Sequence, residues 1–354
     1  MTRNLYLGAD LMPVIASLAY NPQTWPAGVP APDPVPVAAA KTWVAVQATR
    51  PAERMAAIAE EIAAAKPAVV GLQEVTTWTT YANYNPADGS VANPTVAYDF
   101  LQLLLDALAE EGVVYHEVEG ATAHNFASGP IPMITSPTTL GAVEMSDRDV
   151  ILRRDDVLTT KPESGTFDTI IEFPLADGSV IPVHRGWGSV DVRDKAQAFR
   201  FVNAHLEAFG VPGVDEEEIR VGQVTELLAA HEQSQLPVVY VGDYNSAAPA
   251  GDAYELLVDS VGEDAWLETQ PTGVDGDTCC FDAQVSNPAD PLTQRIDLVV
   301  VDDRVEPVTT MLVGEDSSDM FNVADIMLWP SDHAGLVATL EIAHPATWRP
   351  GDRS

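Results

Sequence analysis

The segment VVYVGDYNSAA, residues 238–248, passes from apolar, strand-forming residues directly into Asp243 and Asn245. Side chains two positions apart on an extended segment point to the same side, so a carboxylate and a carboxamide would meet at the carboxyl end of a strand. Hydrolysis of a phosphate ester uses this combination, because a carboxylate can deprotonate water and an amide can hydrogen-bond a phosphoryl oxygen. A strand followed by an Asp/Asn turn explains the segment equally well by itself.

Helical and strand patterns alternate along the chain. Apolar spacing predicts helices over residues 53–66, 98–111, 216–233 and 253–258, with Thr49 as the N-cap of the first and Pro51 in its first turn. Residues 21–40 are rich in proline and predict a surface insertion that is neither helix nor central strand. Strand-like segments fall at residues 4–8, 68–75, 113–120, 149–157, 169–175, 199–209, 237–242, 295–303 and 333–343.

This order of elements favours an α/β fold. Strand–helix–strand units mixed with long hairpin stretches predict a four-layered α/β sandwich, in which two packed mixed sheets are flanked by helices. No break in composition suggests a second domain, so we expect one domain over residues 1–343 and a peripheral tail over residues 344–354.

The net charge of −35, from 53 acidic and 18 basic residues, is extreme. Such a surface repels the phosphate backbone of DNA, although a bound divalent metal can invert the local field. A small or lipid-linked phosphate ester is therefore the expected substrate, and nucleic acid is disfavoured. Acidity of this kind is typical of secreted or salt-adapted proteins, and we expect a monomeric, extracellular mature form without its signal peptide rather than a cytoplasmic protein. No apolar run is long enough to predict a transmembrane helix.

Cys279 and Cys280 are the two cysteines of the chain and are adjacent. Their spacing fits neither a zinc site nor a disulfide framework. They either form a vicinal disulfide or stay reduced, and a disulfide that stiffens the loop is favoured.

Polar residues occupy the ends of several predicted strands, where burial alone would not select them. They are Asn4, Glu74, Asn203, His205, Asp243, Asn245, Asp297, Asp332 and His333. Each has a simple explanation as a turn or a hydrogen-bonded core residue. The sequence contains no GxxxxGK[ST], HExxH, G-x-S-x-G or paired CxxC motif that would indicate another chemistry.

The ordered motifs LQEV, NAHL, GDYN, RIDLVV and SDH resemble those of the endonuclease/exonuclease/phosphatase superfamily, over nearly the full chain from Asn4 to Ala343. This superfamily includes DNase I-like nucleases, abasic-site endonucleases, inositol polyphosphate phosphatases and neutral sphingomyelinases. The opening NLYLGAD and the later TCC look most like its bacterial members. The resemblance implies a DNase I-like fold and hydrolysis of phosphate esters that depends on a divalent metal.

The resemblance also implies a role for each residue. Glu74 and Asn4 would hold Mg²⁺, or Mn²⁺ or Ca²⁺ in its place, with Asp332 near that ion or a second one. Asp243 would orient or deprotonate the attacking water, and Asn245 would hold the water or a phosphoryl oxygen. His333 would contact the phosphate, with Asp297 fixing its tautomer, and His205 would be a second donor to the phosphoryl oxygens.

Several further residues are candidates for substrate binding. Arg148 could bind a phosphate oxygen, or pair with Asp147 or Asp149 at the surface. Asn203 shares a strand face with His205, and Trp329 precedes the SDH motif, so both are expected near the substrate. Arg185 and Trp187 could line the cleft, although packing is the better interpretation of Trp187.

Four functions are compatible with this pattern. A metal-dependent phosphodiesterase or phosphatase is preferred. A nuclease on the same scaffold would need a basic groove, for which the chain has few Lys or Arg residues. A sphingomyelinase-like phospholipase C would need an exposed aromatic hairpin for the membrane, and residues 320–329 are the one weak candidate. A catalytically inactive binding module would have lost the Asp of GDYN or the His of SDH, and both are present.

Overall fold

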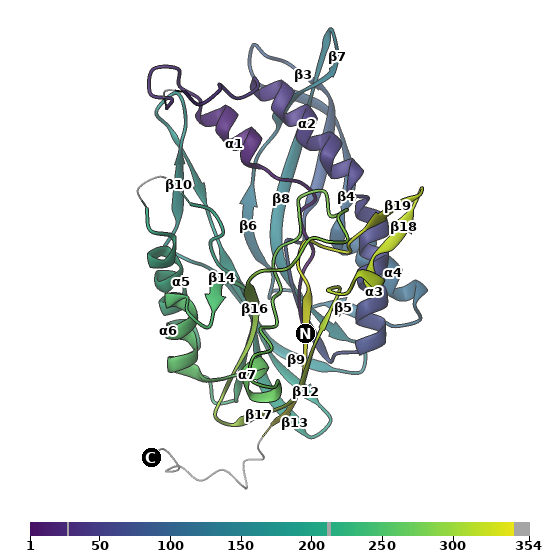
Figure 1. Cartoon of the computed structure of the whole chain (residues 1–354), viewed down its shortest axis with the longest axis vertical. Helices are drawn as coiled ribbons and strands as arrows, with labels where there is room; N and C mark the ends of the chain where they lie inside the picture. Colours follow the sequence, from purple (N-terminus) through teal and green to yellow (C-terminus); the bar gives the residue numbers. More distant parts are fainter. Residues whose placement is uncertain (27, 211–213, 343–354) are drawn as a thin grey trace.

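A computed structural model describes residues 1–26, 28–210 and 214–342 of the chain. Two large β-sheets form its centre (Figure 1). The first has ten strands, in the order β17-β20-β1-β2-β8-β3-β4 with β5, β6 and β7 also paired to β8. The second has six strands, in the order β15-β16-β14-β13-β12-β9.

The strands of the first sheet are β1 (Thr2–Asn4), β2 (Val69–Gln73), β3 (Thr77–Tyr84), β4 (Val91–Asp99), β5 (Tyr115–Glu117), β6 (Ala123–Ala127), β7 (Ile131–Ser136), β8 (Thr139–Arg154), β17 (Val305–Val313) and β20 (Gly335–Ile342). The strands of the second sheet are β9 (Leu158–Thr166), β12 (Gly186–Asp194), β13 (Gln197–His205), β14 (Val238–Ala248), β15 (Gly262–Asp264) and β16 (Arg295–Asp302). Two separate hairpins join β10 (Ile171–Pro174) to β11 (Val180–Val183) and β18 (Phe321–Val323) to β19 (Ile326–Leu328).

The two sheets pack face to face through branched aliphatic side chains. Val239 and Val241 of β14 and Val299 of β16 meet Ile151 of β8 and Leu336 of β20 in one buried cluster. Alternate residues of a strand share a face, so the intervening residues of β14 point to the opposite side of the sheet. The central strands are buried on both faces, which explains their nearly continuous apolar sequences.

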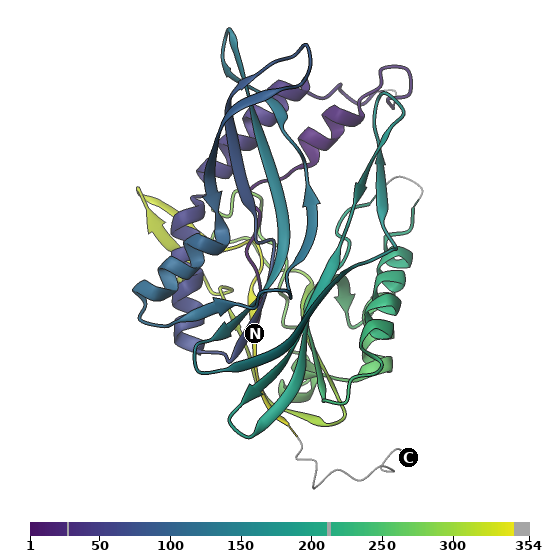
Figure 2. The same ribbon diagram turned by 180° about the vertical axis from the view of Figure 1, so that it is seen from behind.

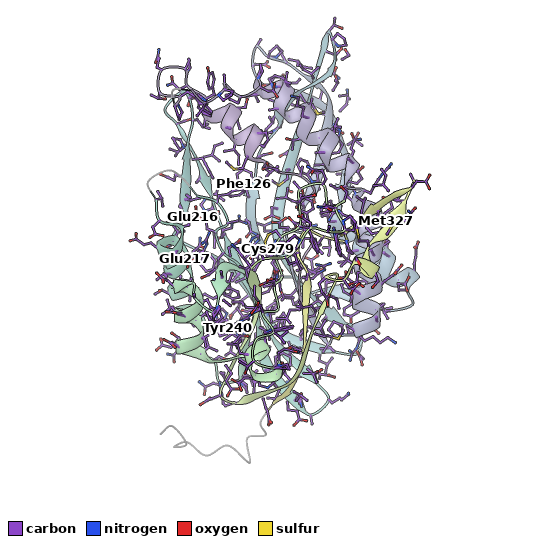
Figure 3. The ribbon with its side chains drawn as sticks, in the orientation of Figure 1. Phe126, Glu216, Glu217, Tyr240, Cys279 and Met327 are labelled. Carbon is purple, nitrogen blue, oxygen red and sulfur yellow. A yellow bond between two sulfur atoms is a disulfide. The ribbon has the colours of Figure 1, made fainter. Side chains whose placement is uncertain are left out.

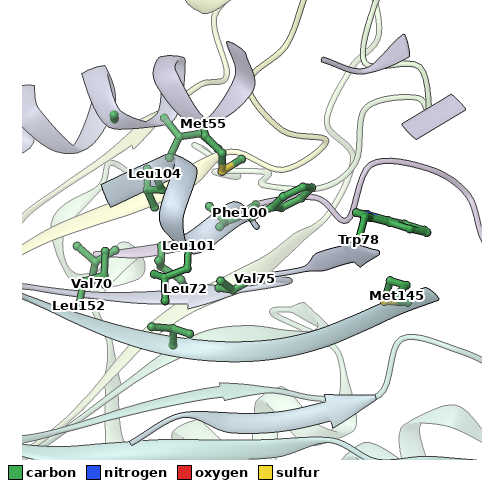
Figure 4. Close-up of a cluster of buried hydrophobic side chains, with 14 of the residues drawn as sticks. Met55, Val70, Leu72, Val75, Trp78, Phe100, Leu101, Leu104, Met145 and Leu152 are labelled. Carbon is green, nitrogen blue, oxygen red and sulfur yellow. The ribbon is translucent and has the colours of Figure 1, made fainter. Parts of the chain in front are cut away.

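Helices cover the outer face of each sheet. The first sheet is covered by α2 (Val35–Ala48), α3 (Pro51–Ala65) and α4 (Phe100–Glu110), whose apolar faces form the cluster drawn in Figure 4. The second sheet is covered by α5 (Glu216–His231) and α6 (Asp252–Val261), seen from behind in Figure 2. The four-layered α/β sandwich predicted from the sequence is confirmed. The remaining helices are α1 (Met12–Ala19), α7 (Ala265–Thr269) and the 3₁₀ helix η1 (Ser317–Asp319).

Three local predictions were wrong. Residues 35–40 of the proline-rich segment begin α2, which is possible because proline lacks only an N–H that is unpaired in the first helical turn anyway. Thr49 ends α2 and does not cap α3, since Arg50 in a left-handed conformation precedes Pro51. The first strand lies at Thr2–Asn4 and not at residues 4–8, where the chain already turns at Tyr6.

The predicted tail, residues 344–354, lies outside the described residues. Among the residues that are described, no helix combines the length and apolarity needed to cross a membrane.

Candidate active site

Three neighbouring strands of the second sheet bring polar residues into register. His205 of β13 lies opposite Asp243 of β14, and Asp243 lies opposite Asp297 of β16. Side chains at opposed positions share one face of the sheet, so this register forms a row of three titratable groups. All three are buried.

His333 completes the row from the other sheet, just before β20. Its Nδ1 lies 2.8 Å from Asp297 Oδ2, and its Nε2 lies 3.8 Å from Asp243 Oδ2. Burial lowers the pKa of His333, but the carboxylates of Asp297 and Asp243 outweigh this effect and raise the pKa well above its usual value. The imidazole is therefore held as a cation between two carboxylates.

Asn4, at the end of β1, contacts the same carboxylate. Its Nδ2 donates to Asp243 Oδ2 at 3.0 Å, while its Oδ1 accepts from the Tyr6 backbone N–H at 2.9 Å. Asp243 Oδ2 thus faces Asn4, His333 and, at 3.7 Å, the Nε2 of His205. Three predicted residues therefore converge on one oxygen atom of a fourth, Asp243.

Two buried arginines fix the loops that carry these residues. The Nη1 of Arg54, on α3, donates to the carbonyls of Leu5 at 2.6 Å and Pro330 at 3.2 Å. Arg3 donates to the carbonyl of His333 and pairs with Glu61 of α3. The segments after β1 and before β20 are therefore tied to each other and to the helix behind them.

Asn245 occupies a bulge after Asp243, where the register between β14 and β16 shifts. Its φ is +49°, its backbone N–H donates to Asp243 Oδ1 at 3.0 Å, and its Nδ2 donates to the carbonyl of Leu206 at 3.1 Å. The two side chains therefore do not simply point the same way along an extended strand, as the sequence spacing suggested. Asn245 instead orients the Asp243 carboxylate through its backbone.

A crowded set of carboxyl groups lies beside this row. Burial, together with the neighbouring carboxylates of Asp332 and Asp147, raises the pKa of Glu74 to about 8. Burial also raises the pKa of Asp332 and of Asp147. Glu74 Oε2 accepts the backbone N–H of Leu7 at 2.6 Å, and among the described residues Asp147 Oδ1 has no hydrogen-bond partner.

These residues fit a divalent cation. Asp147 is buried and Glu74 and Asp332 are partly exposed to the cavity. The charges of Asp147 and Asp332 destabilise ionised Glu74, and all three present hard oxygen donors, the ligand type that Mg²⁺, Mn²⁺ and Ca²⁺ take in proteins. A cation here would favour the ionised carboxylates. Potential ligand atoms also lie within 4.8 Å of one another in two neighbouring groups. One group is Asp243 with Asp297 and His333, and the other is Asp147 with Asp149 and His205.

The structure adds residues that sequence reasoning did not select. Asn125 of β6 donates to Asp147 Oδ2 at 3.2 Å and to Asp149 Oδ2 at 2.9 Å, and Asp149 Oδ1 lies 3.7 Å from His205 Nδ1. Burial raises the pKa of Asp149 to about 7, although Asn125 and Arg185 oppose the rise. The two-residue spacing of Asp147 and Asp149 was a signal for one shared strand face, whereas nothing in the sequence indicated that β6 pairs with β8.

Arg185 brings a cation to the same place. Its Nη2 lies 3.5 Å from Glu207 Oε1, and its Nη1 lies 4.0 Å from Asp147 Oδ2 and 3.4 Å from His205 Nδ1. Burial, together with the Arg185 guanidinium, lowers the pKa of His205 to about 4. His205 is consequently neutral near pH 7, and its two carboxyl contacts are not ion pairs.

Three residues predicted to bind the substrate do not join the cluster of titratable groups around Asp243 and Glu74. Asn203 lies between the sheets, where Gln73 donates to its Oδ1 at 2.6 Å and its Nδ2 donates to the Leu72 carbonyl at 3.0 Å. Arg148 pairs with Asp99, the N-cap residue of α4, because it points away from Asp147 and Asp149 on the opposite face of β8. Trp329 is buried, stacks on Phe281 at 4.0 Å between ring centroids and donates to the Asn287 carbonyl.

Two other features of the sequence are placed by the structure. Trp187 packs edge-on against His231, with ring centroids 4.6 Å apart, and so has a packing role. Cys279 and Cys280 are joined by a disulfide, and Cys280 Sγ lies 3.7 Å from His333 Nε2. The loop-stiffening disulfide favoured from the sequence therefore borders the row of catalytic candidates.

Solved structures share this fold. The mannosyl-6-phosphatase Bt3783 of Bacteroides thetaiotaomicron superposes with a TM-score of 0.52 at 16% identity, over 96% of this chain and 98% of that one. A family protein from the same organism gives 0.53 at 16% identity, over 97% and 96% of the two chains. One from Leptotrichia buccalis gives 0.51 at 16% identity, over 82% and 93%.

A comparison with curated protein sequences found no significant match. The sequence model of the Endonuclease/Exonuclease/phosphatase family matches residues 44–333, a span that holds every residue of the site except Asn4. With its sandwich fold and its row of carboxylates and histidines, this chain belongs to the endonuclease/exonuclease/phosphatase family.

Proposed function

We propose that this protein hydrolyses a phosphate ester by attack of water on phosphorus, with a divalent cation bound beside Glu74. The observation that carries this proposal is the convergence of Asn4, His205 and His333 on Asp243 Oδ2. A carboxylate whose neighbours are an amide, a neutral imidazole and a cationic imidazole can accept the proton of a water molecule.

Each residue then has a defined task. Asp243 accepts the proton of the attacking water, and Asn4 together with the Asn245 backbone N–H holds the carboxylate in place. His333, kept cationic by Asp297, donates to an oxygen on phosphorus as negative charge develops there. His205 is a neutral positioning residue behind Asp243, since it is completely buried.

Glu74 and Asp332 are the proposed metal ligands, with Asn4 through the second lone pair of its Oδ1 and Asp147 as a further candidate. When bound, the cation would neutralise charge on the phosphoryl oxygens and lower the barrier to nucleophilic attack. Mg²⁺ is the first choice because the proposed donors are oxygen atoms, and Mn²⁺ or Ca²⁺ would use the same atoms.

Nucleic acid is the less favoured substrate. Arg148, the cation expected to bind phosphate, is paired with Asp99, and Arg185 is enclosed by Asp147 and Glu207. With a net charge of −35, few Lys or Arg residues remain to contact a polyanionic backbone. We also propose an extracellular location, because disulfides persist in oxidising surroundings and an acidic surface is typical of secreted proteins.

A substrate panel tests this function. We expect hydrolysis of bis(4-nitrophenyl) phosphate in Mg²⁺, its loss in excess EDTA and its return when Mg²⁺ is restored. The panel should include plasmid DNA, sphingomyelin, an inositol phosphate and a mannose 6-phosphate ester, since one protein of the same fold is a mannosyl-6-phosphatase. Activity that persists unchanged in EDTA would refute the metal-dependent mechanism.

A further inference from the structure

A large cavity adjoins the proposed metal ligands. Its volume is about 510 Å³, and Glu74, Asp147, Arg185 and Asp332 line one part of it. Pockets that enclose small-molecule ligands usually span about 300–1,000 Å³. The cavity is therefore large enough for a substantial part of a substrate, beyond the phosphate itself.

Apolar side chains form most of the remaining wall. They come from α1, from the hairpin β10–β11 and from strands β6 and β8, and include Val14, Ile15, Leu18, Phe126, Phe173 and Ile181. Phe126 of β6, labelled in Figure 3, also packs against the apolar cluster of the β10–β11 hairpin.

Two elements outside both large sheets, α1 and the β10–β11 hairpin, contribute part of the wall. The carbonyl of Leu18, near the end of α1, accepts the backbone N–H of Ala176 in the turn between β10 and β11 at 3.3 Å. This contact joins two segments separated by more than a hundred residues. An apolar cavity left empty reduces stability, because its wall loses the contacts that a filled core would make. The arrangement is explained if a ligand supplies those contacts.

We propose that this cavity holds the hydrocarbon chain of a phosphate ester, with its phosphorus at Asp243 and His333 and its chain extending past Arg185 between α1 and β8. The proposal rests on the proposed function and defines its substrate class. The lining combines the charged residues Glu74, Asp147, Arg185 and Asp332 with a wall that is otherwise mostly apolar, which matches a ligand with a phosphate head and an apolar remainder. A nucleoside would bury sugar hydroxyls and base edges against a wall that offers few partners, at a cost for each unpaired group.

A homologous series of alkyl 4-nitrophenyl phosphodiesters tests the proposal, because the leaving group stays constant while the alkyl chain grows from methyl to decyl. Assays in Mg²⁺ stay below the critical micelle concentration of each ester. Burial of each methylene in an apolar site should raise kcat/KM by about fourfold, until the chain fills the cavity and the gain stops. The 4-nitrophenolate released is measured by absorbance.

Leu18→Asn and Leu175→Asn place an amide in the wall of the cavity, at positions that are partly exposed. Each should leave hydrolysis of the methyl ester close to wild type and reduce the advantage of the decyl ester at least tenfold. Leu267→Asn, at an exposed site on α7 that does not line the cavity, is the matched control and should keep the full advantage. Two separate cavity variants guard against one that misfolds.

The outcomes separate the two proposals. A rising series that the cavity variants flatten supports the hydrocarbon site. Equal kcat/KM for methyl and decyl esters, with Mg²⁺-dependent hydrolysis intact, overturns the hydrocarbon site and leaves the phosphoesterase function standing. Absence of hydrolysis for every ester overturns the phosphoesterase function, and the hydrocarbon site with it.

Discussion

Nδ1 of His333 and Oδ2 of Asp297 lie 2.8 Å apart, although Asp297 belongs to β16 of the second sheet and His333 lies just before β20 of the first. This contact fixes which ring nitrogen faces Asp243 and keeps the imidazole charged. It also makes the protonation state of His333 depend on the correct packing of the two sheets.

Asp297→Asn should therefore lower the pKa of His333, because the carboxylate that helps to raise it is removed. We expect kcat to fall by about 10²–10⁴, the usual range for loss of acid–base catalysis, with a smaller change in KM. NMR titration of the imidazole gives the pKa directly. Asp303→Asn, at the exposed turn after the same strand, is the control. A lower kcat with an unchanged His333 pKa would contradict the proposed role of Asp297.

Glu74→Gln should weaken Mg²⁺ binding by at least tenfold, measured by titration calorimetry, whereas the exposed Glu60→Gln should not. A glutamine keeps the size of the side chain and removes the charge. Equal affinities in the two variants would exclude Glu74 as a ligand.

Metal affinity of the wild-type protein should also depend on pH. The pKa of Glu74 is raised to about 8, so at pH 6 the ion must displace a proton that is absent at pH 9. Affinity should therefore rise by up to tenfold per pH unit as the pH approaches 8, and then level off. The proton released on binding can be counted by repeating the calorimetry in buffers of different ionisation enthalpy. An affinity that is constant from pH 6 to 8 would contradict this expectation.

Arg185→Met removes a cation that lines the cavity, and we expect kcat/KM to fall by about tenfold to a hundredfold through loss of its charge beside Asp147 and His205. The change also leaves Glu207 buried without its partner, which destabilises the fold by itself. The double variant Arg185→Met, Glu207→Gln separates these effects. It should recover the melting temperature and not the activity, and recovered activity would show that Arg185 has a structural role alone.

His231 provides a prediction about acid stability. It packs between Trp187 and Tyr240, and burial lowers its pKa from 6.5 to about 4. A group whose pKa is depressed on folding stabilises the protein fully above pH 6.5, and this contribution is lost as the pH falls towards 4. The loss is about 3 kcal/mol. His231→Phe should therefore reduce the difference in unfolding free energy between pH 7 and pH 4.5, measured in urea. An unchanged difference would mean that His231 is not protonated on unfolding in this range.

Sequence patterns predicted the elements whose residues have one clear environment. The apolar spacing of α3, α4 and α5 and the continuous apolar runs of β14 and β16 follow from burial. His205, Asp243, Asp297 and His333 could be identified because each is a polar residue in or beside an apolar strand sequence. The strands β3 and β4 could not be identified, since their exposed, polar sequences carry little periodicity.

Side-chain direction and long-range pairing account for the remaining differences. Arg148 faces away from the site because it alternates with Asp147 and Asp149 along β8. Trp329 precedes the SDH motif by only two residues, but its ring turns inward onto Phe281. The roles of Asn125 and Arg185 depend on which strands become neighbours, and no local pattern contains that information.

Asp243→Asn is the most direct test of the proposed chemistry, because it replaces one oxygen of the carboxylate on which Asn4, His205 and His333 converge. The measurement is hydrolysis of bis(4-nitrophenyl) phosphate at saturating Mg²⁺, beside the exposed Asp252→Asn as control. We predict that Asp243→Asn loses at least 10³-fold in kcat with its circular dichroism unchanged, while Asp252→Asn matches the wild type. A folded Asp243→Asn protein with the wild-type rate would contradict the assignment of Asp243 as the base.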